Sequence, residues 1–224
     1  VYDWAPRTWA RILVRVSGVR IVLHGVERAA PGESRVFASN HVSWFDVFVL
    51  GSVLPRYKFV AKAELFSIPV FGAGARAVGT IPIQRENRKA AFGAYEEAAG
   101  SIRAGSSVVV FPEGTRGREY ALRPFKKGPF VLAIGAQVPI VPTIVHGTIA
   151  VMSRDTWKVR AGTVHVHFLE PVPTRGLTYA DRDRLSRAVW SRMADAMQEL
   201  YGVHSEPPTA RALVRAETQH PLTT

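Results

Sequence analysis

The segment NHVSWFD, residues 40–46, places an imidazole at His41 and a carboxylate at Asp46. A neutral imidazole can accept a proton at neutral pH, and a carboxylate that fixes one ring nitrogen leaves the other free to act as a general base. Positions five apart lie about 140° apart around a regular helix, so the two side chains can meet only if His41 lies in the turn before a helix. The spacing predicts a base with its orienting acid. The alternative is a helix-entry histidine followed by a solvated first-turn acid.

A covalent mechanism would also need a nucleophile near this pair, and Ser43 is the only local candidate. A metal centre would need more ligands than one histidine and one aspartate, and the chain has neither an HExxH motif nor a cysteine. We therefore expect no metal ion at this pair.

Basic side chains follow three further apolar segments. Lys62 in VAKAEL and Arg85 in GTIPIQR each end a predicted strand, and Arg116 ends the turn FPEGTR. Arginine binds a phosphate monoester through a fork of donors, and lysine adds a mobile point charge. Glu113 in the same turn could orient Arg116 or accept a hydrogen bond from a substrate hydroxyl. One such residue is usually exposed to solvent, but three at separate strand ends, beside the histidine and aspartate, predict one phosphate-binding pocket.

The hydrophobic periodicity predicts the elements that must position these residues. Strands are expected in residues 19–27, 35–40, 58–65, 79–85, 106–111, 138–145 and 163–171. Helices are expected in residues 4–17, 42–53, 66–77 as a broken helix, 87–104, 125–137 and 179–201. Strands separated by helices predict an α/β fold with a mostly parallel or mixed central sheet of about seven strands, flanked by helices. Active sites of such folds lie in the turns beyond the strand ends.

The first predicted helix is amphipathic and basic. Its apolar residues at helical spacing are Trp9, Ile12, Leu13 and Val16, and its arginines are Arg7, Arg11 and Arg15. Such a helix suits the headgroup boundary of an anionic membrane, with arginines on lipid phosphates. A first helix packed on its own domain is the alternative.

The composition limits the class of protein. The 224 residues carry a net charge of +11, which favours an anionic partner. A nucleic-acid-binding protein would be expected to show a basic stripe interleaved with exposed aromatic residues, and the sequence shows none. No apolar run approaches the roughly 20 residues of a membrane-spanning helix. The chain begins at Val1 without an initiator methionine, which is compatible with a preceding signal or anchor segment.

With these motifs in order, the sequence resembles the glycerolipid acyltransferases, specifically the 1-acylglycerol-3-phosphate (lysophosphatidic acid) acyltransferase family. NHVSWFD corresponds to the HxxxxD block, and GTIPIQR, FPEGTR and VPIVPT to the three that follow. The resemblance runs from about Gly18 to Pro171. Ala63 departs from the resemblance, because many members carry a second basic residue at this position. The alanine removes only an accessory phosphate contact.

The resemblance implies an enzyme of phospholipid biosynthesis. His41, oriented by Asp46, would deprotonate the free hydroxyl of lysophosphatidic acid as it attacks the thioester of acyl-CoA or acyl-carrier protein. No acyl-enzyme forms, so Ser43 becomes a packing or capping residue. Phosphate binding falls to Lys62, Arg85 and Arg116, and substrate support to Glu113, Gly114 and Thr115. VPIVPT would form an apolar wall, and no cofactor is needed.

The resemblance also implies the domain organisation and the location. We expect residues 1–17 to form a membrane-interface helix, 18–203 the catalytic domain and 204–224 a flexible tail. The protein would be monotopic or peripheral at the cytoplasmic face of the membrane, with no nucleic-acid partner. Two alternatives stay open: the same acyl transfer to another lysolipid, glycolipid or aminolipid, and, more remotely, a non-catalytic basic membrane-binding protein.

Overall fold

The computed structural model describes residues 4–69, 71–77, 79–83 and 88–208. Its centre is a seven-stranded sheet with the order β1-β7-β6-β2-β5-β3-β4. The strands are β1 (Val19–His24), β2 (Val36–Ser39), β3 (Tyr57–Lys62), β4 (Ile81–Ile83), β5 (Ser107–Val110), β6 (Ile140–His146) and β7 (Gly162–Phe168). The predicted α/β class and the number of strands are confirmed.

Strand direction brings the predicted site residues to one edge of the sheet. β4, β3, β5, β2 and β6 all run parallel, whereas β7 is antiparallel to β6 and β1 is parallel to β7. The carboxyl ends of five neighbouring strands therefore meet at the same edge. His41 follows β2, Lys62 ends β3, and the FPEGTR turn follows β5.

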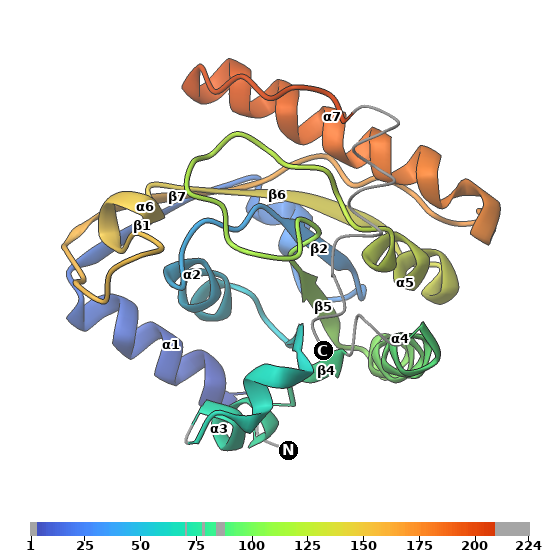
Figure 1. The fold of residues 1–224 in the computed structure, drawn as a ribbon, viewed down its shortest axis with the longest axis horizontal. Helices are drawn as coiled ribbons and strands as arrows, with labels where there is room; N and C mark the ends of the chain where they lie inside the picture. Colours follow the sequence, from blue (N-terminus) through green and yellow to red (C-terminus); the bar gives the residue numbers. More distant parts are fainter. Residues whose placement is uncertain (1–3, 70, 78, 84–87, 209–224) are drawn as a thin grey trace, which may run out of the picture.

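Helices cover both faces of the sheet (Figure 1). They are α1 (Trp4–Val16), α2 (Phe45–Val53), α3 (Phe71–Ala77), α4 (Arg88–Arg103), α5 (Gly128–Ala136), α6 (Thr148–Val151) and α7 (Arg182–Tyr201), with 3-10 turns at Val26–Ala29, Ala63–Ser67 and Tyr179–Asp181. Successive strand residues point to opposite faces, so Val36 and Ala38 pack toward α4, α5 and α7, whereas Phe37 packs toward α1 and α2. Each face thus has its own apolar core.

The start of α2 and the presence of α6 differ from what the sequence predicted. The helix predicted from residue 42 begins at Phe45, because the residues after His41 form a turn that the Asp46 side chain holds. The short helix α6 was not predicted, since four residues are too few to show a period. Asn87, the expected cap of the helix now described as α4, lies outside the described residues.

The first helix packs on its own domain through one face. Ala10 and Val14 are buried, and Trp9 contacts Phe48 of α2 with ring centroids 5.5 Å apart. Four large apolar side chains of α1 are exposed: Trp4, Trp9, Ile12 and Val16 have exposed fractions of 54 to 74%. No helix in the described ranges is both long enough and apolar enough to cross a bilayer.

Two arginines of α1 contact the domain. Arg7 Nη2 donates to the carbonyl of Val53 at 3.2 Å, and Arg11 Nε donates to that of Ser52 at 3.0 Å. These bonds hold the end of α2 and support the alternative of a first helix packed on its own domain, while contact of the arginines with lipid phosphates stays a prediction. Arg15 is exposed.

The segment expected to be a flexible tail, residues 204–224, begins with an attached residue. Ser205 is buried, and its hydroxyl accepts a hydrogen bond from the backbone of Leu122 at 2.9 Å. The start of this segment is thus bound to the loop before α5, and the flexibility of the rest stays a prediction. Residues 209–224 lie outside the described part of the chain.

Candidate active site

His41 and Asp46 are in direct contact. His41 lies in the turn between β2 and α2, as their spacing requires, and its Nδ1 lies 2.8 Å from Oδ2 of Asp46. The His41 side chain is 12% exposed and that of Asp46 is fully buried. Because Nδ1 is held by the carboxylate, Nε2 is the ring nitrogen left to accept a proton from a substrate hydroxyl.

The Asp46 carboxylate is enclosed by hydrogen-bond donors. Oδ2 also accepts bonds from the backbone N–H groups of Val42 and Ser43, each at 2.8 Å. Oδ1 accepts the hydroxyl of Thr148, the first residue of α6, at 2.6 Å. A buried carboxylate without such partners would cost several kcal/mol, so these bonds stabilise Asp46 and fix its position. The same bonds fold the turn that presents His41.

Neighbouring residues of NHVSWFD have structural roles. The buried amide of Asn40 accepts from the Val145 N–H at 2.8 Å and donates to the Val145 carbonyl at 3.0 Å, which ties the end of β2 to β6. Ser43 is fully buried, donates to the Met152 carbonyl at 2.6 Å and accepts from the Phe45 N–H at 3.0 Å. The prediction that Ser43 packs and caps is confirmed, and its hydroxyl is occupied.

The turn after β5 lies against the turn that carries His41. The Phe111 ring stacks on the imidazole with centroids 3.9 Å apart and planes 17° apart. Glu113 Oε1 accepts a hydrogen bond from the backbone N–H of His41 at 2.9 Å, and the backbone N–H of Gly117 donates to the His41 carbonyl at 2.7 Å. Ring orientation is therefore set on one side by Asp46 and on the other by Phe111.

Glu113 is paired with Arg123, so the expectation that it orients Arg116 is wrong. Its Oε2 lies 3.0 Å from Arg123 Nε, and the carboxylate is 2% exposed. Burial raises the pKa of Glu113, while Arg123 and the backbone N–H of His41 act in the opposite direction. Arg123 also donates to the hydroxyl of Thr115 at 3.0 Å. Glu113 and Thr115 thus join Arg123 in bracing the FPEGTR turn.

Arg116 lies at the rim of the site without a carboxylate partner among the described residues. Its guanidinium group stacks over Trp44 at 4.8 Å and donates to the Arg154 carbonyl at 3.4 Å, and Arg154 donates back to the Arg116 carbonyl. Burial lowers the pKa of Arg116, and the positive charge of Arg154 adds to this effect. Two cations held together in this way favour an anionic ligand.

The structure describes most of the other predicted residues, but not all of them. Lys62 is half-buried at the carboxyl end of β3. Gly114 has a φ of +84°, a left-handed conformation that a glycine adopts without strain, and its N–H donates to Phe111 at 3.0 Å. Arg85 lies outside the described residues. VPIVPT forms most of β6, whose side chains are buried in the sheet, so it is a central core strand.

Sequence reasoning missed four residues that support the site: Asn40, Tyr120, Arg123 and Thr148. The Tyr120 hydroxyl accepts the N–H groups of Gly147 at 2.7 Å and Ile149 at 3.1 Å, and so holds the turn that delivers Thr148. Thr148 lies 102 positions from its partner Asp46. The only signal was its place directly after a predicted strand, at the edge where the site was expected.

Comparisons with known proteins found a family model and relatives that match this chain. The Acyltransferase family model matches residues 20–146. The chloroplastic 1-acyl-sn-glycerol-3-phosphate acyltransferase BAT2 of Brassica napus is 38% identical over 173 residues, which cover 76% of this chain and 50% of that protein. The human 1-acyl-sn-glycerol-3-phosphate acyltransferase alpha is 34% identical over 185 residues, covering 82% and 65% respectively. The chain therefore spans only part of these relatives.

A solved structure has the same fold. The 1-acyl-sn-glycerophosphate (LPA) acyltransferase PlsC from Thermotoga maritima superposes with a TM-score of 0.75 at 24% sequence identity. The match covers 91% of this chain and 81% of that one. The seven-stranded sheet with its flanking helices, including the helix at the start, therefore belongs to a known architecture.

Removal of the partner of Glu113 is expected to destabilise the protein in a pH-dependent way. Arg123→Gln leaves a buried carboxyl without its counter-charge, which raises the Glu113 pKa further and costs about 3 kcal/mol at pH 7.5. A carboxyl whose pKa is higher in the folded than in the unfolded state binds its proton more tightly when folded. The penalty should therefore shrink at pH 5, as measured by urea denaturation.

The control is Arg187→Gln, an exposed arginine of α7. It should change the free energy of unfolding by less than about 0.5 kcal/mol at both pH values. Equal penalties for Arg123→Gln at pH 5 and pH 7.5 would contradict the charge pairing.

Proposed function

Because the chain belongs to the acyltransferase family, we propose that it moves a fatty acyl group from a thioester donor to the free hydroxyl of lysophosphatidic acid. The product is phosphatidic acid. The observation that carries the proposal is the 2.8 Å contact between His41 Nδ1 and Asp46 Oδ2 at the carboxyl edge of the sheet. The names of the relatives support the acceptor, and acyl-CoA or acyl-carrier protein would be the donor.

The reaction needs one base and no enzyme nucleophile. His41 Nε2 takes the proton of the acceptor hydroxyl while that oxygen attacks the thioester carbonyl. The tetrahedral intermediate then expels the thiolate, which takes the proton back from the imidazolium. The Asp46 carboxylate stabilises the transient positive charge on His41 and keeps the reactive nitrogen pointed outward. General-base catalysis of this kind contributes about 10² to 10⁴ in rate.

The phosphate of the acceptor would bind at the rim next to the base. The Arg116 guanidinium has no carboxylate partner in the described part of the chain, and Trp44 and the Arg154 carbonyl hold it in place. Lys62, from the neighbouring β3, would add a second positive charge. Arg85 belongs to the same proposal on the resemblance of GTIPIQR to the family motif. Bidentate binding by an arginine favours a phosphate monoester over an uncharged glycerol headgroup.

Membrane attachment would use the exposed apolar side chains of α1 together with residues 152–161. The side chains of α1 are Trp4, Trp9, Ile12 and Val16. The segment 152–161 carries Trp157, which is 81% exposed, among the basic residues Arg154, Lys158 and Arg160. It ends beside α1, since a Cβ atom on Gly18 would lie 2.9 Å from Cβ of Ala161. Tryptophan flanked by cations suits the headgroup region of an anionic bilayer. The Arg116–Arg154 contacts connect this segment to the phosphate-binding rim.

The first test of the proposal removes the base. His41→Ala should lower the turnover of lysophosphatidic acid with acyl-CoA by at least about 10²-fold, because the reaction loses its proposed general base. Release of free thiol measures the rate, and the same assay with acyl-carrier protein identifies the preferred donor.

His204→Gln serves as the control, because this exposed histidine lies outside the site. An unchanged rate in His41→Ala, with an unchanged melting temperature, would eliminate the proposed mechanism. A panel of lysolipid acceptors tests the narrower assignment, which fails if lysophosphatidic acid is not preferred.

The phosphate-binding role of Arg116 predicts a loss of selectivity. Arg116→Ala should lower kcat/KM for lysophosphatidic acid by about 10- to 100-fold, which is the effect of losing a hydrogen bond to a charged group. The kcat/KM for monoacylglycerol, which has no phosphate, should change much less. The ratio of the two kcat/KM values is the measurement. Arg118→Ala, an exposed neighbour paired with Asp155, is the matched control. Equal losses for both acceptors would show that Arg116 has only a structural role.

The membrane proposal predicts weaker binding to vesicles when exposed tryptophans are removed. Trp9→Ser and Trp157→Ser should each weaken binding to phosphatidylglycerol–phosphatidylcholine vesicles, measured by sedimentation, by about 10- to 100-fold. Each variant loses the burial of one large apolar side chain, which is worth roughly 1.5 to 3 kcal/mol. Tyr179→Ser removes an aromatic ring that is 63% exposed elsewhere and should have no effect. Unaltered sedimentation of both tryptophan variants would assign these residues no role at the membrane.

A further inference from the structure

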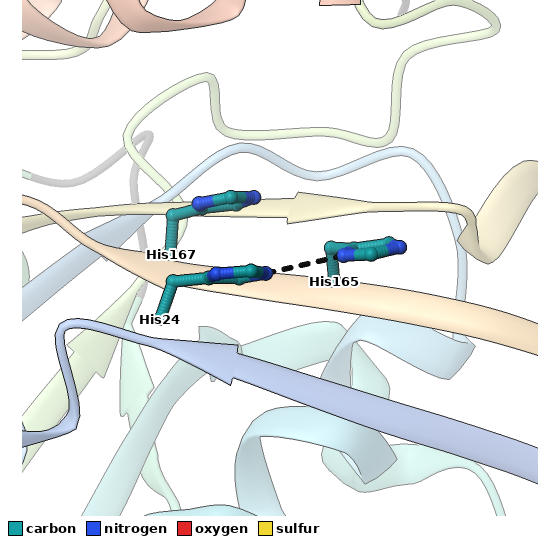
Figure 2. A group of neighbouring side chains, drawn as sticks. All are labelled: His24, His165 and His167. Carbon is teal, nitrogen blue, oxygen red and sulfur yellow. Dashed lines mark hydrogen bonds between the residues drawn. The ribbon is translucent and has the colours of Figure 1, made fainter. Parts of the chain in front are cut away.

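Three histidines gather on one face of the sheet, apart from the candidate active site. His24 ends β1, and His165 and His167 alternate along β7, so all three point to the same side (Figure 2). The register of the two strands places His24 directly beside His167. The side chains are exposed, half-buried and buried in the order His24, His165 and His167.

The ring nitrogens lie close enough to converge on one ion. One nitrogen from each histidine lies within 4.8 Å of the other two. His24 Nε2 and His165 Nδ1 are 3.2 Å apart. A metal ion with bonds of about 2.0 to 2.1 Å to imidazole in tetrahedral geometry spaces its ligand atoms by roughly 3.4 Å. One pair therefore already has nearly the required spacing, and the third ring must shift by about 1 Å or turn about its Cβ–Cγ bond.

The chemistry of the cluster selects a particular kind of ion. The contact between His24 and His165 joins two ring nitrogens, so one of them must present a lone pair, which is the form that binds a metal. No carboxylate belongs to the cluster. Three neutral imidazoles suit Zn²⁺, Ni²⁺, Co²⁺ or Cu²⁺, whereas Mg²⁺ and Ca²⁺ prefer oxygen ligands.

The surroundings hold the cluster in place and leave one side open. His167 Nε2 lies 2.6 Å from the hydroxyl of Tyr201 at the end of α7, a contact that orients the ring. The rings of His24 and His167 are stacked with centroids 4.1 Å apart. Exposure of His24 gives an ion a path from solvent. Stacking alone would explain the parallel rings, and metal binding distinguishes the two explanations.

We propose that His24, His165 and His167 form a binding site for a divalent transition-metal ion that joins the edge strand β1 to β7. The open side of the site takes water as the remaining ligand. The site lies outside the proposed acyl-transfer machinery, and its function is to fasten the strand that directly follows α1. The local sequence did not indicate it, because the third ligand lies 141 positions from its nearest partner.

Zinc titration of the whole chain tests the proposal. Protein treated with a chelator and dialysed at pH 7.5 should bind about one equivalent of Zn²⁺ in a saturable isotherm. At a free Zn²⁺ concentration 100 times the dissociation constant, the melting temperature should rise by about 5 to 10 °C. Substitution of Co²⁺ should give the visible spectrum of a tetrahedral ion.

Two variants locate the ion. His24→Gln and His165→Gln should each weaken Zn²⁺ binding at least about tenfold without altering the melting temperature of the metal-free protein. His167 is left intact because it is buried and bound to Tyr201. His204→Gln, which removes an exposed histidine elsewhere, should bind Zn²⁺ like the original chain. Absence of saturable binding, or equal binding by the His24→Gln/His165→Gln double variant, would overturn the proposal.

Discussion

The Asp46 carboxylate has no exposed surface, and every group that contacts it donates a hydrogen bond. Its donors come from a turn after β2, from His41 in that turn, and from Thr148 after β6. A buried charge cannot exchange these donors for water, so the turn after β2 and the start of α6 are both held against Asp46. The start of α2, the position of α6 and the direction of the imidazole all follow from this one group.

Features set by nearby residues could be predicted from the sequence. The sheet followed from alternating apolar segments, and the meeting of His41 with Asp46 followed from five positions and one turn. Contacts between distant segments could not be predicted in this way. Asn40 binds Val145 across 105 positions, and periodicity carries no information about which strand lies beside which.

The partner of Glu113 and the inner position of Arg7 were missed for the same reason. Proximity in sequence favoured Arg116 as the partner of Glu113, but the turn carries Arg116 away toward Trp44 and brings Arg123 back. Likewise, the pattern of α1 defined an apolar and a basic face without saying which one meets the domain. Arg7 turned out to lie on the inner side, because carbonyl groups at the end of α2 needed donors.

Both ends of α2 are electrostatically matched to their surroundings. A helix carries about half a positive charge at its start and half a negative charge at its end. Asp46 lies at the first end, and the guanidinium groups of Arg7 and Arg11 lie at the second, where they donate to the carbonyl groups of Val53 and Ser52. The amphipathic α1 is therefore part of the dipole compensation of the helix that bears the carboxylate, and a border drawn after residue 17 would cut through a single electrostatic unit.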